Sequence, residues 1–578
     1  MWREMEVSTM TGIRLRNIRR IGALALFMAS ALNAQDNRTR SIPSSPTGET
    51  LLAGADRKFT PHQKLGLRLL SLAESEAAGA QPDIQAFVLW QASHGYRQID
   101  PARADSLLKH AFQVTFSIAK ATDRCMSPAE FCGPKYWLQK EILQDMIAQS
   151  KEIRQIEPLL ASAEPEVRMI VGQNLFHRYI KEKNFERARY LLYQMAEENE
   201  YFCYGCAADL MEAIPRNESH EKLAIFSQAF RGYREHPKEK YPSLDDFAML
   251  ILRSWKDLPP SVVVEASDEV MDRAKEADKE QQNARVGISA NKGRVDFASV
   301  YQFRLYQLIP VLQQLDKPRA ESLLRENREL QGTFERYPEG LASMNALPNP
   351  DSRPKGDLPR ILSIGSTDAT QSDLEDVRRD IARRQQLVLS EAKTDPKQAL
   401  SDAMSLPLDL GPESDFSPRI YALTSLARIA ASKDPAVSVA AVGSIRKTAE
   451  NMPIGRQAAT LADLPEIYLE LGEEPEARDA LKKLGKIAAD LYNHDSDLDD
   501  PNQAFKGMWP SANLWRRCIA VAAKLSPNLS EEMIQDIPDP DLRAFETITL
   551  ANSLLGVNVA SLSIIEKHKN GVRASMAD

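Results

Sequence analysis

Apolar residues recur every three or four positions along most of this chain, which is the spacing of one face of an α-helix. The clearest stretch is 461–484, where Leu464, Tyr468 and Leu471 form one apolar stripe. A second stripe follows, in which Ala477 and Leu481 place a small and a large residue one helical turn apart. The pattern predicts two helices joined by a tight turn.

The residues between the two stripes suit such a turn. Gly472 can adopt the left-handed backbone that ends many helices, and Pro475 can occupy a first helical turn, where a missing N–H costs nothing. A helix pair of this kind cannot bury its apolar face alone and needs neighbours of the same kind. An all-α fold is therefore expected.

A second stretch repeats the first at identical intervals. The matching residues are Leu464, Tyr468, Ala477 and Leu481 in one copy and Leu175, Tyr179, Ala188 and Leu192 in the other. A tetratricopeptide repeat interlocks its two helices in this way, and both stretches resemble that family. Phe176 and Pro465 stand where the family has a small residue, and its late proline is absent. The resemblance implies a fold of stacked helical hairpins and no particular function.

A looser signal precedes several predicted second helices, where an acidic residue with a proline is followed by a small residue. The acidic residues are Asp100, Asp316, Asp395, Asp434 and Glu474. The carboxylate can accept from free N–H groups of the first turn, and proline has its φ already set. The small residues are Ala104, Ala188, Ala320, Ala399, Ala436 and Ala477. Their intervals approximate multiples of about 40 residues, which predicts an α-solenoid of stacked helix-turn-helix repeats, TPR-like or HEAT-like. The alternative is that Asp-Pro simply starts helices in an all-α protein.

The N-terminal residues have a different composition. Four arginines between positions 14 and 20 precede an uncharged apolar run at 21–32, and small residues follow around Ala34. This order predicts a signal peptide at 1–34, with a buried helix or membrane anchor as alternatives. We therefore expect an exported protein, periplasmic or extracellular, with a flexible leader at 35–60.

Composition divides the rest of the chain. We expect an N-terminal helical-repeat segment at 61–337, a linker rich in Pro, Gly and Ser at 338–371, a C-terminal helical-repeat segment at 372–566 and a flexible tail at 567–578. Residues 281–298 interrupt the helical pattern, and a loop is favoured there over a short β-hairpin.

Charge and hydropathy narrow the function classes. The 578 residues are 43% hydrophobic and 27% charged, with a net charge of −8 that becomes −11 without the basic residues 1–34. An acidic chain without a concentrated basic face does not suit a nucleic-acid partner. No internal stretch approaches the roughly 18 apolar residues of a membrane helix, so no transmembrane segment is expected in the mature chain.

The cysteines are the main chemical candidates. In an exported protein, Cys125, Cys132, Cys203 and Cys206 are disulfide candidates, and pairing within each local pair is favoured by proximity. A redox dithiol at 203–206 and a four-cysteine zinc site are the alternatives. We expect Cys518, within a predicted helix, to be a buried thiol.

Two other clusters of residues allow either a structural or a functional interpretation. The alternating aspartates at 495–500 could form a loose calcium site, but they lack the glycine and glutamate of an EF-hand, so a solvated loop is favoured. Tyr301, Phe303 and Tyr306 around Arg304 could line a groove, although a buried helix face is the commoner explanation.

No catalytic, cofactor-binding or metal-binding set is recognisable, since neither HExxH, GxSxG nor a phosphate-cradling loop occurs. The sequence favours a protein-binding scaffold or adaptor in the cell envelope, because solenoids present extended binding surfaces. The alternative is an all-helical enzyme acting on envelope glycans, whose two carboxylates would meet only in the folded protein.

Overall fold

Helices make up nearly all of the regular structure in this computed structural model. It describes residues 59–119, 133–150, 152–198, 202–235, 246–280, 285–290, 293–344, 360–362, 369–409, 417–497 and 505–557. All its elements belong to one compact unit that begins at Pro61. The predicted signal peptide, most of the leader and the C-terminal tail lie outside the described residues.

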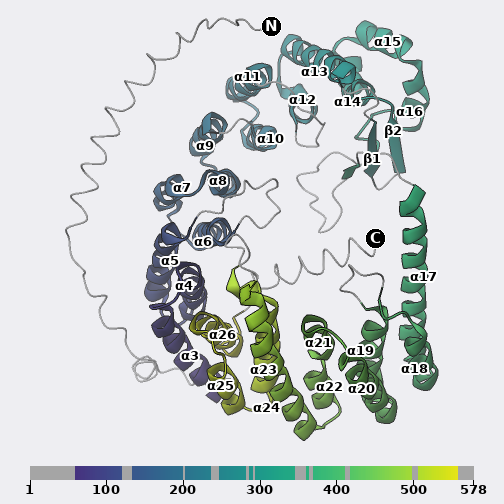
Figure 1. Cartoon of the computed structure of the whole chain (residues 1–578). Helices are drawn as coiled ribbons and strands as arrows, with labels where there is room; N and C mark the ends of the chain where they lie inside the picture. The colour runs from purple at the N-terminus through teal and green to yellow at the C-terminus, as the bar shows by residue number, and fades with distance from the viewer. Residues whose placement is uncertain are drawn as a thin grey trace, which may run out of the picture. The chain divides into compact units, whose positions relative to one another are not determined.

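In the N-terminal segment, helices follow one another in pairs (Figure 1). They are α3 (Pro61–Ala77), α4 (Pro82–Tyr96), α5 (Pro101–Val114), α6 (Pro134–Gln149), α7 (Glu157–Ser162), α8 (Pro165–Lys181), α9 (Phe185–Glu198), α10 (Tyr204–Ala213), α11 (Ser219–Glu235), α12 (Phe247–Ser254), α13 (Pro260–Glu280), α14 (Val300–Leu315), α15 (Lys317–Glu326) and α16 (Gln331–Arg336).

The C-terminal segment continues the arrangement. Its helices are α17 (Ala369–Glu391), α18 (Pro396–Ser405), α19 (Pro418–Ala431), α20 (Pro435–Ala449), α21 (Ile454–Leu461), α22 (Leu464–Glu470), α23 (Glu474–Asp497), α24 (Pro510–Leu525), α25 (Pro527–Gln535) and α26 (Pro540–Leu554). Single 3₁₀ turns occupy Thr115–Ser117, Ile153–Gln155, Trp255–Asp257, Arg328–Leu330 and Lys506–Met508.

A small sheet replaces the loop expected at 281–298. Strands β1 (Val286–Ala290) and β2 (Gly293–Phe297) pair antiparallel, and β3 (Arg360–Leu362) adds to the other edge of β1. The loop interpretation was wrong because the alternating apolar side chains, among them Ile288 and Phe297, have a core to enter. Phe297 lies against Tyr306 of α14, with ring centroids 5.0 Å apart. Within the predicted linker, 345–359 and 363–368 lie outside the described residues.

The two matching stretches have the same helix ending. Tyr179 and Tyr468 are both buried, as the repeat pattern requires, and their carbonyls accept from the backbone N–H five residues later, at 2.9 and 2.8 Å. In each copy the residue four positions after the tyrosine has positive φ, 58° at Lys183 and 77° at Gly472. The turn predicted at Gly472 is confirmed, and its first copy forms without a glycine.

This difference predicts that substitutions at the two turns have opposite effects on stability. A side chain in the left-handed region costs about 1–2 kcal/mol. Lys183→Gly should therefore raise the free energy of unfolding by about 0.5–1 kcal/mol, after the greater freedom of glycine in the unfolded chain is subtracted, and Gly472→Ala should lower it by about 1 kcal/mol. Urea unfolding of both variants checks the signs; the same sign at both positions would contradict the argument.

The structure explains why the chain can depart from the tetratricopeptide pattern at Pro465. The first helix of this pair is divided into α21 and α22, and Pro465 lies in the first turn of α22. Proline cannot donate an N–H to an upstream carbonyl, so a continuous helix is interrupted there. The tetratricopeptide-like pattern survives on α22, where Leu464 and Tyr468 remain buried.

The caps are confirmed at the four aspartates, but one of the small residues was assigned wrongly. Asp395 and Asp434 each accept from the backbone N–H three residues later, at 3.1 and 3.4 Å. The position four residues after the cap is buried, as at Ala399, so the equivalent after Asp434 is Ser438 and not the exposed Ala436. The Ser438 hydroxyl donates to the carbonyl of Ala427 on the partner helix at 2.7 Å, which lets the helices approach closely.

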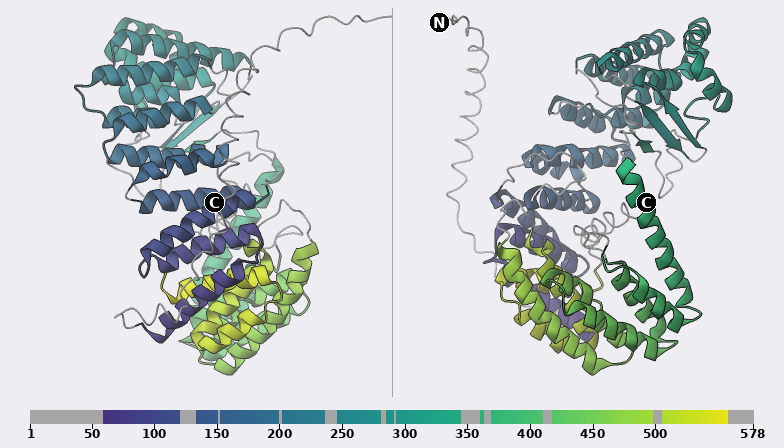
Figure 2. Two further views of the ribbon diagram at one scale, coloured as in Figure 1. Left: turned by 90° about the vertical axis from the view of Figure 1, so that its left-hand side faces the viewer. Right: turned by 45° about the vertical axis from the view of Figure 1, so that its right-hand side comes forward.

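The first and last described helices pack against each other. Helix α26 contacts α3 along its length and also contacts α4, and we call this contact the terminal interface. In the left view of Figure 2 the purple N-terminal helices lie against the yellow C-terminal ones. Inside the interface the Asn552 side-chain amide donates to the Gln91 carbonyl at 3.0 Å, with both residues buried. Helix α26 thus completes a helix pair with α3 from the opposite end of the chain.

An aromatic cluster fills the terminal interface. Phe545 of α26 lies 4.6 Å from Phe87 of α4 and 5.4 Å from Phe505, measured between ring centroids. Trp137 of α6 completes the cluster, 5.5 Å from Phe505. All four side chains are buried. Phe505, which precedes α24, is therefore part of the core and joins α6 to α26.

Gly507 and Lys506 hold the residues around Phe505, just before α24, in place. A Cβ on Gly507 would lie 2.4 Å from the Phe545 ring, so only glycine fits. The Lys506 ammonium donates to Asp539 at 3.0 Å and to Asp541 at 2.7 Å, and Asp541 also accepts from the backbone N–H of Gln81. One lysine therefore holds the segment before α24 to the start of α26.

Candidate functional site

The first helices of successive pairs contact one another in a row. In the N-terminal segment the row runs α4, α6, α8, α10, α12 and α14, and in the C-terminal segment it runs α17, α19, α22, α24 and α26; α26 contacts α4. We call this set the first-helix row. The second helices α9, α11 and α13 pack on the first helices before and after them. The row therefore extends through both segments and across the terminal interface.

Acid–base pairs link neighbouring helices of the row. Asp145 of α6 accepts from His94 at 2.8 Å and from the Trp90 indole at 2.6 Å, both of α4. Asp209 of α10 lies 3.6 Å from His177 of α8 and accepts from Arg253 of α12 at 2.6 Å. These partly exposed groups give the row a mixed-charge surface that includes two histidines.

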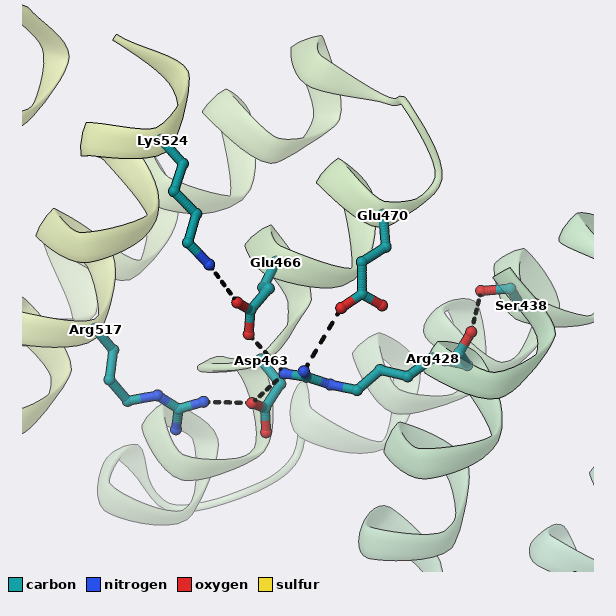
Figure 3. A network of polar contacts seen from close by, with 8 residues as sticks. Arg428, Ser438, Asp463, Glu466, Glu470, Arg517 and Lys524 are labelled. Atoms are coloured by element: carbon teal, nitrogen blue, oxygen red, sulfur yellow. Dashed lines mark hydrogen bonds and ion pairs between the residues drawn. The ribbon is translucent and has the colours of Figure 1, made fainter. Parts of the chain in front are cut away.

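Figure 3 shows a larger network between α19, α22 and α24. Arg428 of α19 lies 3.0 Å from Asp463, 2.8 Å from Glu466 and 3.6 Å from Glu470. From α24, Arg517 contacts Asp463 and Lys524 donates to Glu466 at 2.6 Å.

Three cations face three carboxylates in this network, so its formal charge is balanced. The hydrogen bond from Lys524, assisted by that from Arg428, lowers the pKa of the Glu466 carboxyl. Because each of these charged groups has a partner, the network joins three helices and leaves no group poised for chemistry. We assign it a structural role.

A neighbouring part of the α24 surface has a different character. A partly open pocket of about 250 Å³ lies between α24 and α26. Glu546 lies at its floor and is almost completely buried, whereas Ala520 and Ser553 at its mouth are exposed. The Arg516 guanidinium enters from α24, with Nε 3.7 Å from the Glu546 Oε1.

The polar atoms of this pocket are not fully satisfied. Neither the Nε of Arg516 nor the Oε1 of Glu546 has a hydrogen-bond partner among the described residues. Burial raises the pKa of Glu546 to about 8, and Arg516 opposes this shift only in part. The carboxyl is therefore mostly protonated at pH 7, and the pocket is our candidate functional site.

Sequence reasoning missed Glu546, although a signal was present. The residue lies four positions after Leu542 and four before Leu550, so it interrupts an apolar helical stripe with an acid. A carboxylate on the buried stripe of a helix is a candidate for a shifted pKa. Arg516 carried no comparable signal, since it is one of two adjacent arginines on a predicted helix.

The structure divides the predicted cysteine candidates. Cys203 and Cys206 form a disulfide that spans the start of α10, as predicted for this local pair. Cys125 and Cys132 lie outside the described residues. Cys518 is a buried free thiol, and burial raises its pKa to about 12, so it is unreactive.

The other clusters have structural roles. Phe303, Arg304 and Tyr306 are buried within α14, so the buried-face interpretation holds for them. The solvated loop favoured at 495–500 is wrong at its start, because Asp495 lies in α23, is buried and accepts from the backbone N–H of Ser511 at 2.9 Å. Asp499 and Asp500 lie outside the described residues. In the described part of the chain, we find neither a group of three His, Cys, Asp or Glu side chains able to hold a metal nor a helix long and apolar enough to span a membrane.

Comparison with known proteins gives little further guidance. No family model and no curated protein matches the chain. Among solved structures, the chain is similar to one described as "Circular tandem repeat protein with novel repeat topology and enhanced subunit contact surfaces". The sequence identity is 12% and the TM-score 0.12, over 89% of this chain and 100% of that chain. A TM-score this low supports no argument about fold or function.

Proposed function

We propose that the chain is an exported α-solenoid that binds a protein partner through its first-helix row, as a scaffold or adaptor in the cell envelope. The observation that carries the proposal is the row itself. Its helices contact one another directly, whereas α9, α11 and α13 pack between first helices. Helices that approach more closely belong on the inner side of a curved array, and solenoids use that side as an extended binding surface.

A repeat of about 40 residues is part of this proposal. With Ser438 in place of Ala436, the buried small residues Ala399, Ser438 and Ala477 are each 39 residues apart. All three lie one turn into a second helix, at α18, α20 and α23. The regular interval supports stacking of equivalent pairs in this segment.

The binding proposal can be tested on one helix pair. Asn174 and His177 are exposed on α8, while Glu186 and Tyr190 are exposed on its second helix α9. A partner cross-linked to the full chain in envelope extracts would be identified, purified and titrated against two double-lysine variants. Lysines at 174 and 177 should weaken binding at least tenfold, since they place two bulky cations on the row.

Lysines at 186 and 190 are the matched control, because they change the other face of the same pair. The control variant should bind the partner with the same affinity as the unmodified chain. Recovery of no partner above background, or equal weakening by both variants, would rule out binding through the row.

Export is proposed on the sequence pattern of residues 1–34, and a disulfide at Cys203–Cys206 is compatible with an oxidising compartment. Mass spectrometry of the protein from fractionated cells tests it. We expect a mature N-terminus near residue 35 in the periplasmic or extracellular fraction. An intact N-terminus in the cytoplasmic fraction would contradict export.

The alternative is an all-helical enzyme acting on envelope glycans. The one observation in its favour is Glu546, whose pKa of about 8 would suit a general acid. Glycosidases usually require a second carboxylate about 5–9.5 Å away. Glu546 is the only acid among the described residues that line the pocket, and we therefore rank this function second.

A further inference from the structure

The pocket between α24 and α26 has two chemically distinct parts. Its walls come from one face of each helix, since positions 516, 519 and 520 on α24 and 546, 549, 550 and 553 on α26 follow helical spacing. Ile519 and Leu550 supply a buried apolar wall, and Val557 extends it after α26. Arg516 and Glu546 supply the polar end. A volume of about 250 Å³ limits a ligand to a small group.

The polar end is held rigidly by contacts outside the pocket. Arg516 Nη2 donates to the carbonyl of Gly507 at 2.6 Å, and its guanidinium lies 5.0 Å from the centroid of the Phe545 ring. These contacts fix the guanidinium and direct its charge toward the pocket. The Arg516 Nε and the Glu546 Oε1 remain without hydrogen bonds among the described residues. Buried polar atoms of this kind are costly unless something binds them.

The charges at this end do not cancel at neutral pH. Burial raises the pKa of Glu546 to about 8, so its carboxyl is mostly neutral at pH 7 and can donate an O–H. An arginine guanidinium carries a positive charge in proteins. The buried thiol of Cys518 on α24, the other titratable group that interacts with Glu546, is also neutral. The pocket therefore presents one positive charge and two hydrogen-bond donors.

We propose that this pocket binds the carboxylate of a ligand with a short aliphatic chain, with Arg516 Nε and the Glu546 carboxyl donating to the carboxylate and the chain lying against Ile519, Leu550 and Val557. A monoanion neutralises the Arg516 charge and satisfies both unpaired polar groups. An amide brings no charge, so it leaves the buried Arg516 charge without a counter-ion. This site goes beyond partner binding by the first-helix row and does not depend on it.

The proposal requires a defined pH dependence. When Glu546 loses its proton, it can no longer donate and repels the bound carboxylate. Affinity should therefore be constant from pH 6 to about 7 and fall about tenfold for each pH unit above 8. The buried thiol of Cys518, with its pKa raised to about 12, does not ionise between pH 6 and 9, so the slope comes from Glu546.

Binding to the full mature chain can be measured by ligand-observed NMR and calorimetry. The probes are 3-methylbutanoate, its amide, and a hexapeptide ending in valine with a free or an amidated C-terminus. We expect each carboxylate that fits to bind at least tenfold more tightly than its amide. Binding of the free acid alone identifies a small metabolite as the ligand, and binding of the peptide identifies a C-terminal carboxylate; either result supports the site.

Three variants separate the contributions. Ala520→Phe changes an exposed residue at the mouth, so it should block binding with little effect on the melting temperature. Glu546→Gln keeps a neutral donor and should retain binding without the loss above pH 8. Arg516→Gln should abolish binding. Three outcomes would overturn the proposal. They are equal affinity for the acid and its amide, no binding of any probe, and an Ala520→Phe variant that binds the acid as tightly as the unmodified chain does.

Discussion

Replacing Phe545 with alanine is expected to lower the free energy of unfolding by about 3–5 kcal/mol, because a fully buried ring is lost and the cavity cannot collapse easily. Its neighbours Phe87 and Phe505 come from different parts of the chain and are each held by further packing. The loss should extend beyond α26. Amide hydrogen exchange in α3 and α4 should accelerate together with that in α26, since these helices share one interface.

The matched control is Tyr190→Ala, which removes an aromatic side chain that is 56% exposed on α9. Its effect on stability should stay within about 0.5 kcal/mol. If exchange in α3 and α4 were unchanged in Phe545→Ala, the terminal interface would not exist in solution.

Arg304→Leu is expected to cost about 3–5 kcal/mol for a different reason. Its guanidinium donates to Asp246 at 2.6 Å, and the two side chains are 5% and 1% exposed. Removing one partner of a buried pair leaves the other charge in a poorly solvating interior, and this penalty exceeds the value of the pair itself. Asp246 also caps α12 through the backbone N–H of Met249, so α12 should loosen first.

The control for this prediction is Arg178→Ala, which breaks an ion pair with Glu182 on the surface of α8. Exposed pairs of this kind are worth about 0.2–1 kcal/mol. In urea unfolding, the double variant Asp246→Asn/Arg304→Leu should be more stable than the sum of its single changes predicts. Simple additivity would show that the two groups do not form a coupled pair.

Local features of the fold were predictable from the sequence because they depend on neighbouring residues. The matching intervals around Tyr179 and Tyr468 predicted two equivalent helix pairs, and Asp395 and Asp434 predicted caps. The assignment of Ala436 was wrong because it selected the nearest alanine after the cap instead of the residue four positions after the cap. Ser438, four residues after its cap, is small enough for the close approach and adds a hydrogen bond to the partner helix.

Long-range features were not predictable in the same way. Helical periodicity shows that a face is buried but not which helix covers it, so the contact of α26 with α3 left no trace in the pattern. The pocket required the same missing information, because Arg516 and Glu546 meet only when α24 and α26 pack. The acid within the stripe of α26 was the one visible sign.

The pairing of α3 with α26 has a consequence for how the protein is made. Helix α3 leaves the ribosome before every other described helix, yet α26, which covers it, is the last of them to be synthesised. Until synthesis is complete, the apolar face of α3 is exposed and can be bound by chaperones. A truncated chain would keep this apolar surface exposed and would be prone to aggregation. Linear repeat arrays can lose their outermost units one by one, but here neither terminal unit can leave without exposing the other.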